Sequence, residues 1–349
     1  MNITPRSPEE FSNQWFEHCL KAPPGSLENW SAQAIGDGHI AGSYRVLLKW
    51  KHDGQPLSVV VKCPHPGDQN RQIAKELWLY RREVAWYQVF AEQSRVRCPK
   101  CYFVSINAAG DEFALILEDC APAKQGDQLS GATTNIVAKA LREMALLHTP
   151  FFLNPSALNN ECLQYDFKHR KEKVAQFDWA WPLFKERYRG RFDQDFFEMG
   201  DRFCASFEKF VYMESSQNTL IHNDVRLDNM LVGGADGRII ILDWQTVGIG
   251  SPMCDVAYLI GTSFSDSAIR KREEKSLFNQ YVDTLKTLGG VVDEDRLWKE
   301  YRIQSFSGFV QAVCAGMLVE RTERGDEMFA VMAERPGQQV LDLDSLELL

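Results

Sequence analysis

The sequence predicts an α+β protein of two lobes, a small β-rich lobe over residues 1–120 and a large helical lobe over residues 121–349. Segments that favour β-strands recur as far as residue 118. Residues 121–131 are then rich in Pro, Gly, Gln and Asp, as linkers are. Helical periodicity dominates from Thr133 onward, apart from one β-like island at residues 231–242.

The small lobe is expected to begin with a short helix over residues 8–20, because Ser7 and Pro8 precede two glutamates in a typical helix start. A second helix is predicted over residues 71–93, where apolar side chains recur at helical spacing. Four segments favour strands, and turn signals join them in pairs: residues 44–50, 57–62, 101–106 and 113–118.

The composition is that of an ordinary soluble globular protein, with 44% hydrophobic and 25% charged residues. A net charge of -9 argues against a nucleic-acid partner. We see neither an apolar signal segment nor a membrane-length apolar stretch, so we expect no membrane partner. The nine cysteines are scattered and odd in number, as in a cytoplasmic protein with reduced thiols.

The strongest chemical signal is the segment from His222 to Asn229, which contains Asp224 and is followed by an apolar strand ending in Asp243. This order fits phosphoryl transfer. An aspartate on a loop can orient an attacking hydroxyl and take its proton. An asparagine five residues later and an aspartate after the next strand can supply the oxygen ligands that Mg²⁺ prefers. The combination is far more specific than a lone glycine motif.

With these residues the sequence resembles the aminoglycoside phosphotransferase and choline kinase superfamily, and within it most closely the bacterial relatives of the ecdysteroid-kinase-like group. The resemblance is sharpest in these residues: His222, Asp224, Arg226, Asp228, Asn229, Asp243, Trp244, Gln245 and Asp255 to Tyr258. It implies a two-lobed protein-kinase-like fold that uses ATP and Mg²⁺. It further implies Asp224 as catalytic base and Asn229 and Asp243 as metal ligands, with Arg226 placed to meet the transferred phosphate.

The same context gives Lys62, at the end of a predicted strand, the role of neutralising the nucleotide phosphates. A carboxylate on the following helix would hold this lysine. Glu83 is the predicted partner, and Glu76, two turns earlier, is the alternative.

Two further segments are expected to contact the nucleotide. Gly36 and Gly38 begin a glycine-rich loop whose backbone could approach the phosphates closely, although its spacing departs by one residue from the strict motif. Glu118, which ends a predicted strand, is expected to lie at the hinge where backbone groups would hold adenine.

Three side chains are expected to support the catalytic loop rather than to react. His222 is predicted to pack the loop. Asp255 could cap a helix, and by resemblance it braces the loop from beneath. Asp228 is predicted to stabilise the loop by hydrogen bonding.

The acceptor is expected to be a small molecule with a hydroxyl group. Only eleven residues separate Asp243 from Asp255, which leaves little room for a peptide-binding platform. Residues 150–215 hold many aromatic side chains. These could line a pocket for an apolar or cationic acceptor, or they could form ordinary helical core.

We therefore predict an enzyme, an ATP- and Mg²⁺-dependent kinase that transfers the γ-phosphate to the hydroxyl of a small molecule. A sterol-like compound, an antibiotic, a choline-like amine and a hydroxyacyl thioester all remain open as acceptors, and so does the oligomeric state. The alternative is a nucleotide-binding pseudokinase that acts as a partner-binding module. The presence of base, metal ligands and lysine disfavours it.

Overall fold

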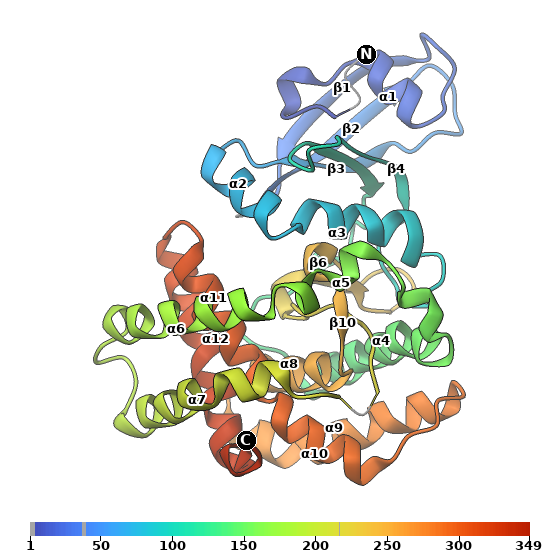
Figure 1. The fold of residues 1–349 in the computed structure, drawn as a ribbon. Coiled ribbons are helices and arrows are strands. Elements are labelled where there is room, and N and C mark those ends of the chain that lie inside the picture. Colours follow the sequence, from blue (N-terminus) through green and yellow to red (C-terminus); the bar gives the residue numbers. More distant parts are fainter. Residues whose placement is uncertain (1–3, 37–39, 216) are drawn as a thin grey trace. The chain divides into compact units, whose positions relative to one another are not determined.

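Strands from the first third of the chain pair into one antiparallel sheet in the order β1-β2-β3-β5-β4 (Figure 1). The computed structural model describes residues 4–36, 40–215 and 217–349. The strands are β1 (Leu27–Ala34), β2 (Ala41–Trp50), β3 (Ser58–Pro64), β4 (Cys101–Ile106) and β5 (Phe113–Glu118). With the helical C-terminal part, this sheet confirms the predicted fold class. The two strands at 101–106 and 113–118 have the predicted bounds.

The chain divides into two compact units. Unit 1 comprises Met1–Gln93, Cys98–Pro122 and Leu242–Thr246, and unit 2 comprises Ser94–Arg97, Ala123–Ile241 and Val247–Leu349. The prediction divided the chain once, after residue 120. The structure differs because Leu242–Thr246 packs in unit 1, where the Trp244 ring stacks on Trp86 with centroids 3.4 Å apart. This contact joins residues 158 positions apart, which sequence patterns do not reveal.

The helices of unit 1 depart from the prediction at both expected positions. The first helix, α1, spans Asn13–Cys19 and is capped by Ser12, whereas Ser7 precedes only a 3₁₀ turn, η1 (Pro8–Glu10). The second is divided at Trp78, whose φ of 59° is incompatible with a continuing α-helix. The three resulting pieces are α2 (Asp68–Glu76), α3 (Leu79–Ala85) and the π-helix η2 (Trp86–Phe90).

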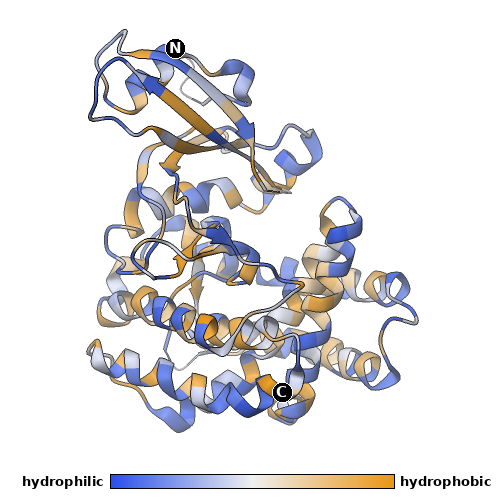
Figure 2. Cartoon of the chain, turned by 180° about the vertical axis from the view of Figure 1, so that it is seen from behind, coloured by the Kyte–Doolittle hydropathy of each residue, from blue (hydrophilic) through white to orange (hydrophobic). Residues whose placement is uncertain are grey.

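Strand β1 was not predicted, because most of its side chains are polar or exposed and none is β-branched. It forms through pairing with β2 over its length. Hydrophobic stretches run along parts of this sheet (Figure 2), and they include Val59–Val61 of β3 and Ala114–Leu117 of β5. The core cluster on this sheet includes Trp15 and Phe16 of α1 together with Val46, Val59 and Ile116.

Unit 2 is built mainly of helices (Figure 1). They are α4 (Thr134–Leu153), α5 (Glu161–Lys168), α6 (Arg170–Arg187), α7 (Gln194–Tyr212), α8 (Met253–Ser263), α9 (Ser267–Thr287), α10 (Glu294–Gln304), α11 (Phe306–Leu318) and α12 (Glu323–Asp342), with short 3₁₀ turns η3 (Pro155–Leu158), η4 (Leu227–Asn229) and η6 (Ser345–Leu348). Among the described residues, no helix combines the length and apolar character that crossing a membrane requires.

Two small sheets position the central loop of unit 2. Strand β7 (Thr219–Ile221) pairs with β10 (Gly248–Gly250), and β8 (Met230–Val232) lies between β6 (Lys124–Gln125) and β9 (Ile240–Ile241). The predicted β-like island is therefore the β8–β9 hairpin. The loop that connects β7 to β8 contains Asp224 and Asn229.

Most aromatic side chains of α6 and α7 pack into the helical core, whereas Trp179 and Tyr212 are exposed. Phe177, Trp181 and Phe184 are at most 2% exposed. Phe203 stacks on Phe306 of α11 with centroids 4.0 Å apart. The helical-core interpretation of this region is thus the one that the packing supports.

Candidate active site

Asp224 lies on the loop after β7, and neighbouring groups hold both of its carboxylate oxygens. The Tyr258 hydroxyl of α8 donates to Oδ1 at 2.8 Å, and the Asn229 amide donates to Oδ2 at 2.8 Å. The Asn229 amide also donates to the Asp224 carbonyl oxygen at 2.9 Å. Because Asn229 donates through its nitrogen, its amide oxygen points elsewhere and can serve as a ligand.

The Tyr258 hydroxyl is a buried hydrogen-bond donor. The sequence placed Tyr258 in the segment from Asp255 to Tyr258 that carries the family resemblance, but it predicted no role for this side chain. Its side chain is 2% exposed. Burial, and then the nearby Asp224 carboxylate, raise the pKa of the Tyr258 hydroxyl well above its ordinary value, so the hydroxyl keeps its proton and donates. The carboxylate of Asp224 is thereby fixed in one orientation.

The backbone before Asp224 is braced by the carboxylate of Asp255. Its Oδ2 accepts the His222 N–H at 2.7 Å, and its Oδ1 accepts the Asn223 N–H at 2.8 Å. Asn223 has a φ of 67°, a conformation that non-glycine residues adopt at a cost. Asp255 lies inside α8 and binds the loop amides. Asp255 is therefore not the helix cap that the sequence left open, and it braces the loop as the resemblance implies.

His222 has the geometry of a packing residue. It is fully buried, and its Nδ1 accepts the Asp224 N–H at 3.2 Å. A second histidine, His148 of α4, was missed by sequence reasoning. Its Nε2 lies 3.1 Å from Asp255 Oδ2 and its Nδ1 lies 2.7 Å from the Tyr281 hydroxyl. Nothing in the local sequence around His148 indicates these contacts.

Arg226 links the loop to α12. Its Nε lies 3.5 Å from Asp224 Oδ2, and its Nη1 donates to Asp228 Oδ2 at 2.9 Å. The Sδ atom of Met328 lies 3.1 Å from the same Nη1. The guanidinium of Arg324, also from α12, lies 3.3 Å from the Asp228 carboxylate. Positive and negative groups therefore alternate beside Asp224.

The segment predicted as a linker is part of the loop's support. Gln128 is fully buried, its N–H donates to Asp228 Oδ1 at 2.9 Å, and its Oε1 accepts the Leu227 N–H at 2.9 Å. The Gln125 amide donates to the Asp228 carbonyl oxygen at 2.6 Å. The polar composition of this segment predicts a linker, because the sequence does not distinguish a buried glutamine from an exposed one.

In unit 1, Lys62 of β3 is held by two carboxylates. Its Nζ donates to both oxygens of Glu83, at 2.6 and 2.8 Å, and to Asp243 Oδ1 at 3.0 Å. Glu83 lies on α3 and its side chain is 1% exposed. The alternative, Glu76, instead accepts from Gln72 at 2.7 Å on an exposed surface.

Burial alone would lower the pKa of Lys62, but the Asp243 and Glu83 carboxylates outweigh it and raise that pKa above its ordinary value. The ammonium group is therefore charged at neutral pH. Asp243 has a φ of 63°, and its Oδ2 accepts from Gln245 at 3.0 Å. The strained backbone and the Trp244 stack together hold the carboxylate beside the lysine.

Of the other predicted nucleotide contacts, Gly36 follows β1 with a φ of +71°, a conformation that glycine adopts without strain. Gly38 lies outside the described residues. The Glu118 N–H donates to the Lys100 carbonyl oxygen at 2.8 Å, and its carboxylate accepts the Lys100 N–H at 3.0 Å. The N–H of Glu118 is thus used within the sheet.

The donors suit a hard cation better than a soft one. Asn229 offers an amide oxygen and Asp243 a carboxylate, and both are oxygen ligands of the kind Mg²⁺ takes. In the described part of the chain, no three His, Cys, Asp or Glu side chains cluster as a metal site of their own. Each of these side chains would need further ligands beside it, such as phosphate oxygens and water.

This combination of an antiparallel N-terminal sheet, a helical C-terminal part and paired Asp and Asn side chains on one loop defines the kinase-like class of phosphotransferase folds. The sequence profile of the ecdysteroid kinase-like family matches residues 36–291. The chain belongs to the ecdysteroid kinase-like family, which confirms the resemblance.

Solved structures agree at the level of the fold. A choline kinase from Cryptosporidium parvum Iowa II has a TM-score of 0.59 at 12% identity, over 96% of each chain. The choline kinase LicA from Streptococcus pneumoniae has 0.52 at 16% identity, over 95% of this chain and 97% of that one. The ADP-bound aminoglycoside phosphotransferase APH(2'')-Ib has 0.50 at 13% identity, over 95% and 99%.

Curated relatives match only short segments. "Acyl-CoA dehydrogenase family member 11" from Gallus gallus is 30% identical over 67 residues, 19% of this chain. An Arabidopsis thaliana relative, named as the acyl-CoA dehydrogenase IBR3, is 45% identical over 40 residues, 11% of this chain. The matches span 9% and 5% of the lengths of these two relatives.

Proposed function

We propose that this protein is an ATP- and Mg²⁺-dependent kinase that phosphorylates the hydroxyl group of a small molecule. The observation that carries the proposal is the Asp224 carboxylate, held between Tyr258 and Asn229 on a loop braced by Asp255. A fixed carboxylate with a neighbouring amide oxygen is what in-line phosphoryl transfer to an alcohol requires. Membership of a kinase-like family supports the same proposal.

In this mechanism Asp224 orients the acceptor hydroxyl and takes its proton. The bond from the hydroxyl oxygen to the γ-phosphorus forms while the bond from that phosphorus to the ADP oxygen breaks, and ADP leaves with the electron pair. Arg226 would meet the charge on the transferred phosphate. The structural relative with bound ADP supports a nucleotide as the donor.

Lys62 would hold the nucleotide phosphates, with Gly36 and Gly38 lying over them and Glu83 keeping the lysine in place. Glu118 would lie at the hinge, where backbone groups would hold adenine. Asn229 and Asp243 would hold Mg²⁺, which neutralises phosphate charge when bound. A small-molecule partner, a cytoplasmic location and the absence of nucleic-acid or membrane partners remain predictions.

The test is ADP release with MgATP across a library of hydroxyl compounds. It should include aminoglycosides, choline and ethanolamine, sterols, sugars and hydroxyacyl thioesters. The thioesters are included because both curated relatives are named as acyl-CoA dehydrogenases. We expect at least one compound to stimulate ADP release, and Asp224→Ala to abolish the stimulation. MgATP binding without ADP release from any compound would instead favour the pseudokinase.

A further inference from the structure

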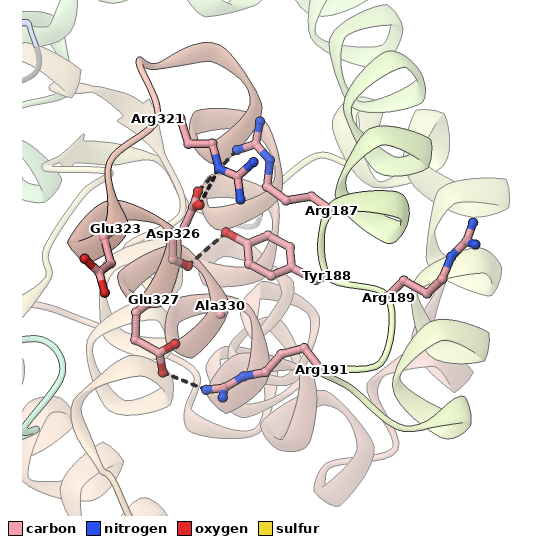
Figure 3. A pocket seen from close by; sticks show the side chains of 9 residues that line it. All are labelled: Arg187, Tyr188, Arg189, Arg191, Arg321, Glu323, Asp326, Glu327 and Ala330. Carbon is pink, nitrogen blue, oxygen red and sulfur yellow. Dashed lines mark hydrogen bonds and ion pairs between the residues drawn. The ribbon is translucent and has the colours of Figure 1, made fainter.

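A hollow of about 420 Å³ at the beginning of α12, in unit 2, is lined by charged side chains that pair with one another (Figure 3). Asp326 pairs with both Arg187 and Arg321. Glu327 pairs with Arg191 at 2.7 Å. These ion pairs join the end of α6 to α12, and they give no reason to expect a ligand there. A contact of Tyr80 in unit 1, by contrast, bears directly on the proposed nucleotide site.

The Tyr80 hydroxyl lies where the pairing of β2 with β3 ends. The register of these strands pairs Ala41 with Pro64, and one step further it places Ile40 opposite His65. At this step the Tyr80 hydroxyl donates to the Ile40 carbonyl oxygen at 2.6 Å and accepts the His65 N–H at 3.2 Å. The side chain therefore bridges the two strands at the point where they part.

The Tyr80 side chain is fixed by its surroundings. It is fully buried, and its ring stacks on Phe113 of β5 with centroids 4.3 Å apart. Burial raises the pKa of the hydroxyl to about 12, so the hydroxyl keeps its proton for the bond to Ile40. His65 is fixed as well, because Arg71 Nη1 donates to its carbonyl oxygen at 3.2 Å. The hydroxyl is therefore a rigid anchor for Ile40.

Ile40 belongs to the glycine-rich segment that is expected to approach the nucleotide phosphates. In the sequence it lies between Gly38 and Gly42, and β2 begins at the next residue, Ala41. A glycine-rich backbone has many conformations available to it, so fixing its shape costs conformational entropy. The Tyr80 hydroxyl holds this segment at the end that enters β2.

The same tyrosine is linked to the lysine site. Glu83 follows Tyr80 by three residues on α3, a spacing that places both side chains on one face of the helix. On β3, Lys62 precedes His65 by three residues, and Lys62 Nζ donates to Glu83 at 2.6 Å. The break at Trp78 separates α3 from α2, so one short helix carries both Tyr80 and Glu83. Tyr80 therefore ties the glycine-rich segment to the strand and the helix that form the lysine site.

We propose that Tyr80 is a positioning residue for nucleotide binding, whose hydroxyl fixes the end of the glycine-rich segment relative to Lys62 and Glu83. The inference rests on the proposed function, in which Lys62 and this segment hold the phosphates. A segment that is anchored beforehand loses less conformational entropy when it closes on a ligand, so the anchor increases affinity. The gain is confined to nucleotides whose phosphates reach the segment.

The experiment is calorimetric titration of MgATP into the wild type and Tyr80→Phe, with adenosine measured by its displacement of MgATP. Tyr80→Phe keeps the ring and its stacking and removes only the hydroxyl. We expect its Kd for MgATP to rise about three- to tenfold, the effect of one hydrogen bond, and its Kd for adenosine to stay unchanged. Tyr301→Phe is the matched control and should bind both as the wild type does. The Tyr301 hydroxyl is also fully buried, and in unit 2 it donates to Glu274 at 2.7 Å and accepts from Gln339 at 2.9 Å.

Equal Kd values of the wild type and Tyr80→Phe for MgATP would overturn the inference and leave the kinase proposal intact. Weaker binding of adenosine by the same factor would also overturn it, because a merely structural defect acts on the whole nucleotide site. Partial unfolding cannot imitate the expected result, since it lowers the number of binding sites and not the ratio of the two Kd values. A wild type that binds no MgATP would contradict the proposed function, and the inference with it.

Discussion

The Asp224 carboxylate shows how a single residue is prepared by its surroundings. Tyr258 and Asn229 each donate to one of its oxygens, and the loop amides before it are fixed by Asp255. Such fixed groups avoid the cost of reorganising at the moment of reaction. We therefore expect substitutions of Asp224 and Tyr258 to alter turnover more than nucleotide affinity.

Replacing Asp224 by Asn should lower kcat by about 10²–10⁴-fold, the range typical of a lost general base. The Kd for MgATP should change little, because the carboxylate acts on the acceptor. Single-turnover kinetics and equilibrium titration of MgATP measure the two quantities separately. Retention of near-normal kcat would contradict the assigned role.

Tyr258→Phe should lower kcat about tenfold while the KM for ATP stays unchanged, because the variant loses only the hydroxyl that orients Asp224. Tyr301→Phe is the matched control. The Tyr301 hydroxyl is also fully buried and also donates to a carboxylate, Glu274, at 2.7 Å. Similar loss of stability in both variants with loss of kcat in Tyr258→Phe alone would support a positioning role. Equal kcat in both would refute it.

At the scale of elements, α1 is tied to the sheet by a carboxylate. Glu17 Oε1 accepts the Leu27 N–H at 2.9 Å, at the first residue of β1. Backbone N–H groups, that of Leu27 foremost, lower the pKa of Glu17 below its ordinary value. Since the pKa is lower in the folded state, this contact stabilises the fold above the ordinary pKa of 4.5, and the stabilisation is lost as the pH falls through the lowered value.

Hydrogen exchange at the start of β1 should report this contact. Protection of the Leu27 amide should fall in the wild type as the pH drops below 4.5 and through the lowered pKa of Glu17, after correction for intrinsic exchange. Glu17→Gln keeps an oxygen acceptor but does not titrate. In this variant the protection of the Leu27 amide should be lower than in the wild type at pH 7, and it should change little as the pH is lowered. A pH dependence equal to that of the wild type would show that Glu17 is not the group that titrates.

At the scale of the whole molecule, MgATP binding is linked to thermal stability. A ligand at about 100 times its Kd stabilises the native state by about 2.7 kcal/mol. For units of this size that corresponds to a rise in Tm of roughly 5–10 °C. We expect this rise in the wild type and in Asp224→Asn, measured by differential scanning calorimetry with and without MgATP.

Asp243→Asn should reduce the rise markedly, because it removes the carboxylate assigned to Mg²⁺. Asp236→Asn, in the turn between β8 and β9, is the control and should retain it. An undiminished rise in Asp243→Asn would show that this carboxylate is not needed for nucleotide binding.

The order of residue types along the chain was enough to predict which side chains could carry the chemistry. The His222–Asn229 segment, the strands at 101–106 and 113–118 and the β8–β9 hairpin were predictable, because local alternation and turn residues specify them. Helix ends were less predictable. The break at Trp78 comes from a left-handed residue in an otherwise helical pattern.

Which side chains meet depends on the packing of distant elements. This packing placed Glu83 rather than Glu76 on Lys62, brought the Tyr258 hydroxyl to Asp224 across 34 positions, and buried Gln128 from a segment with the composition of a linker. It also buried Phe177, Trp181 and Phe184 of α6 in the core. The physical reason is that local preferences act within a few residues, whereas burial and pairing depend on which elements pack together.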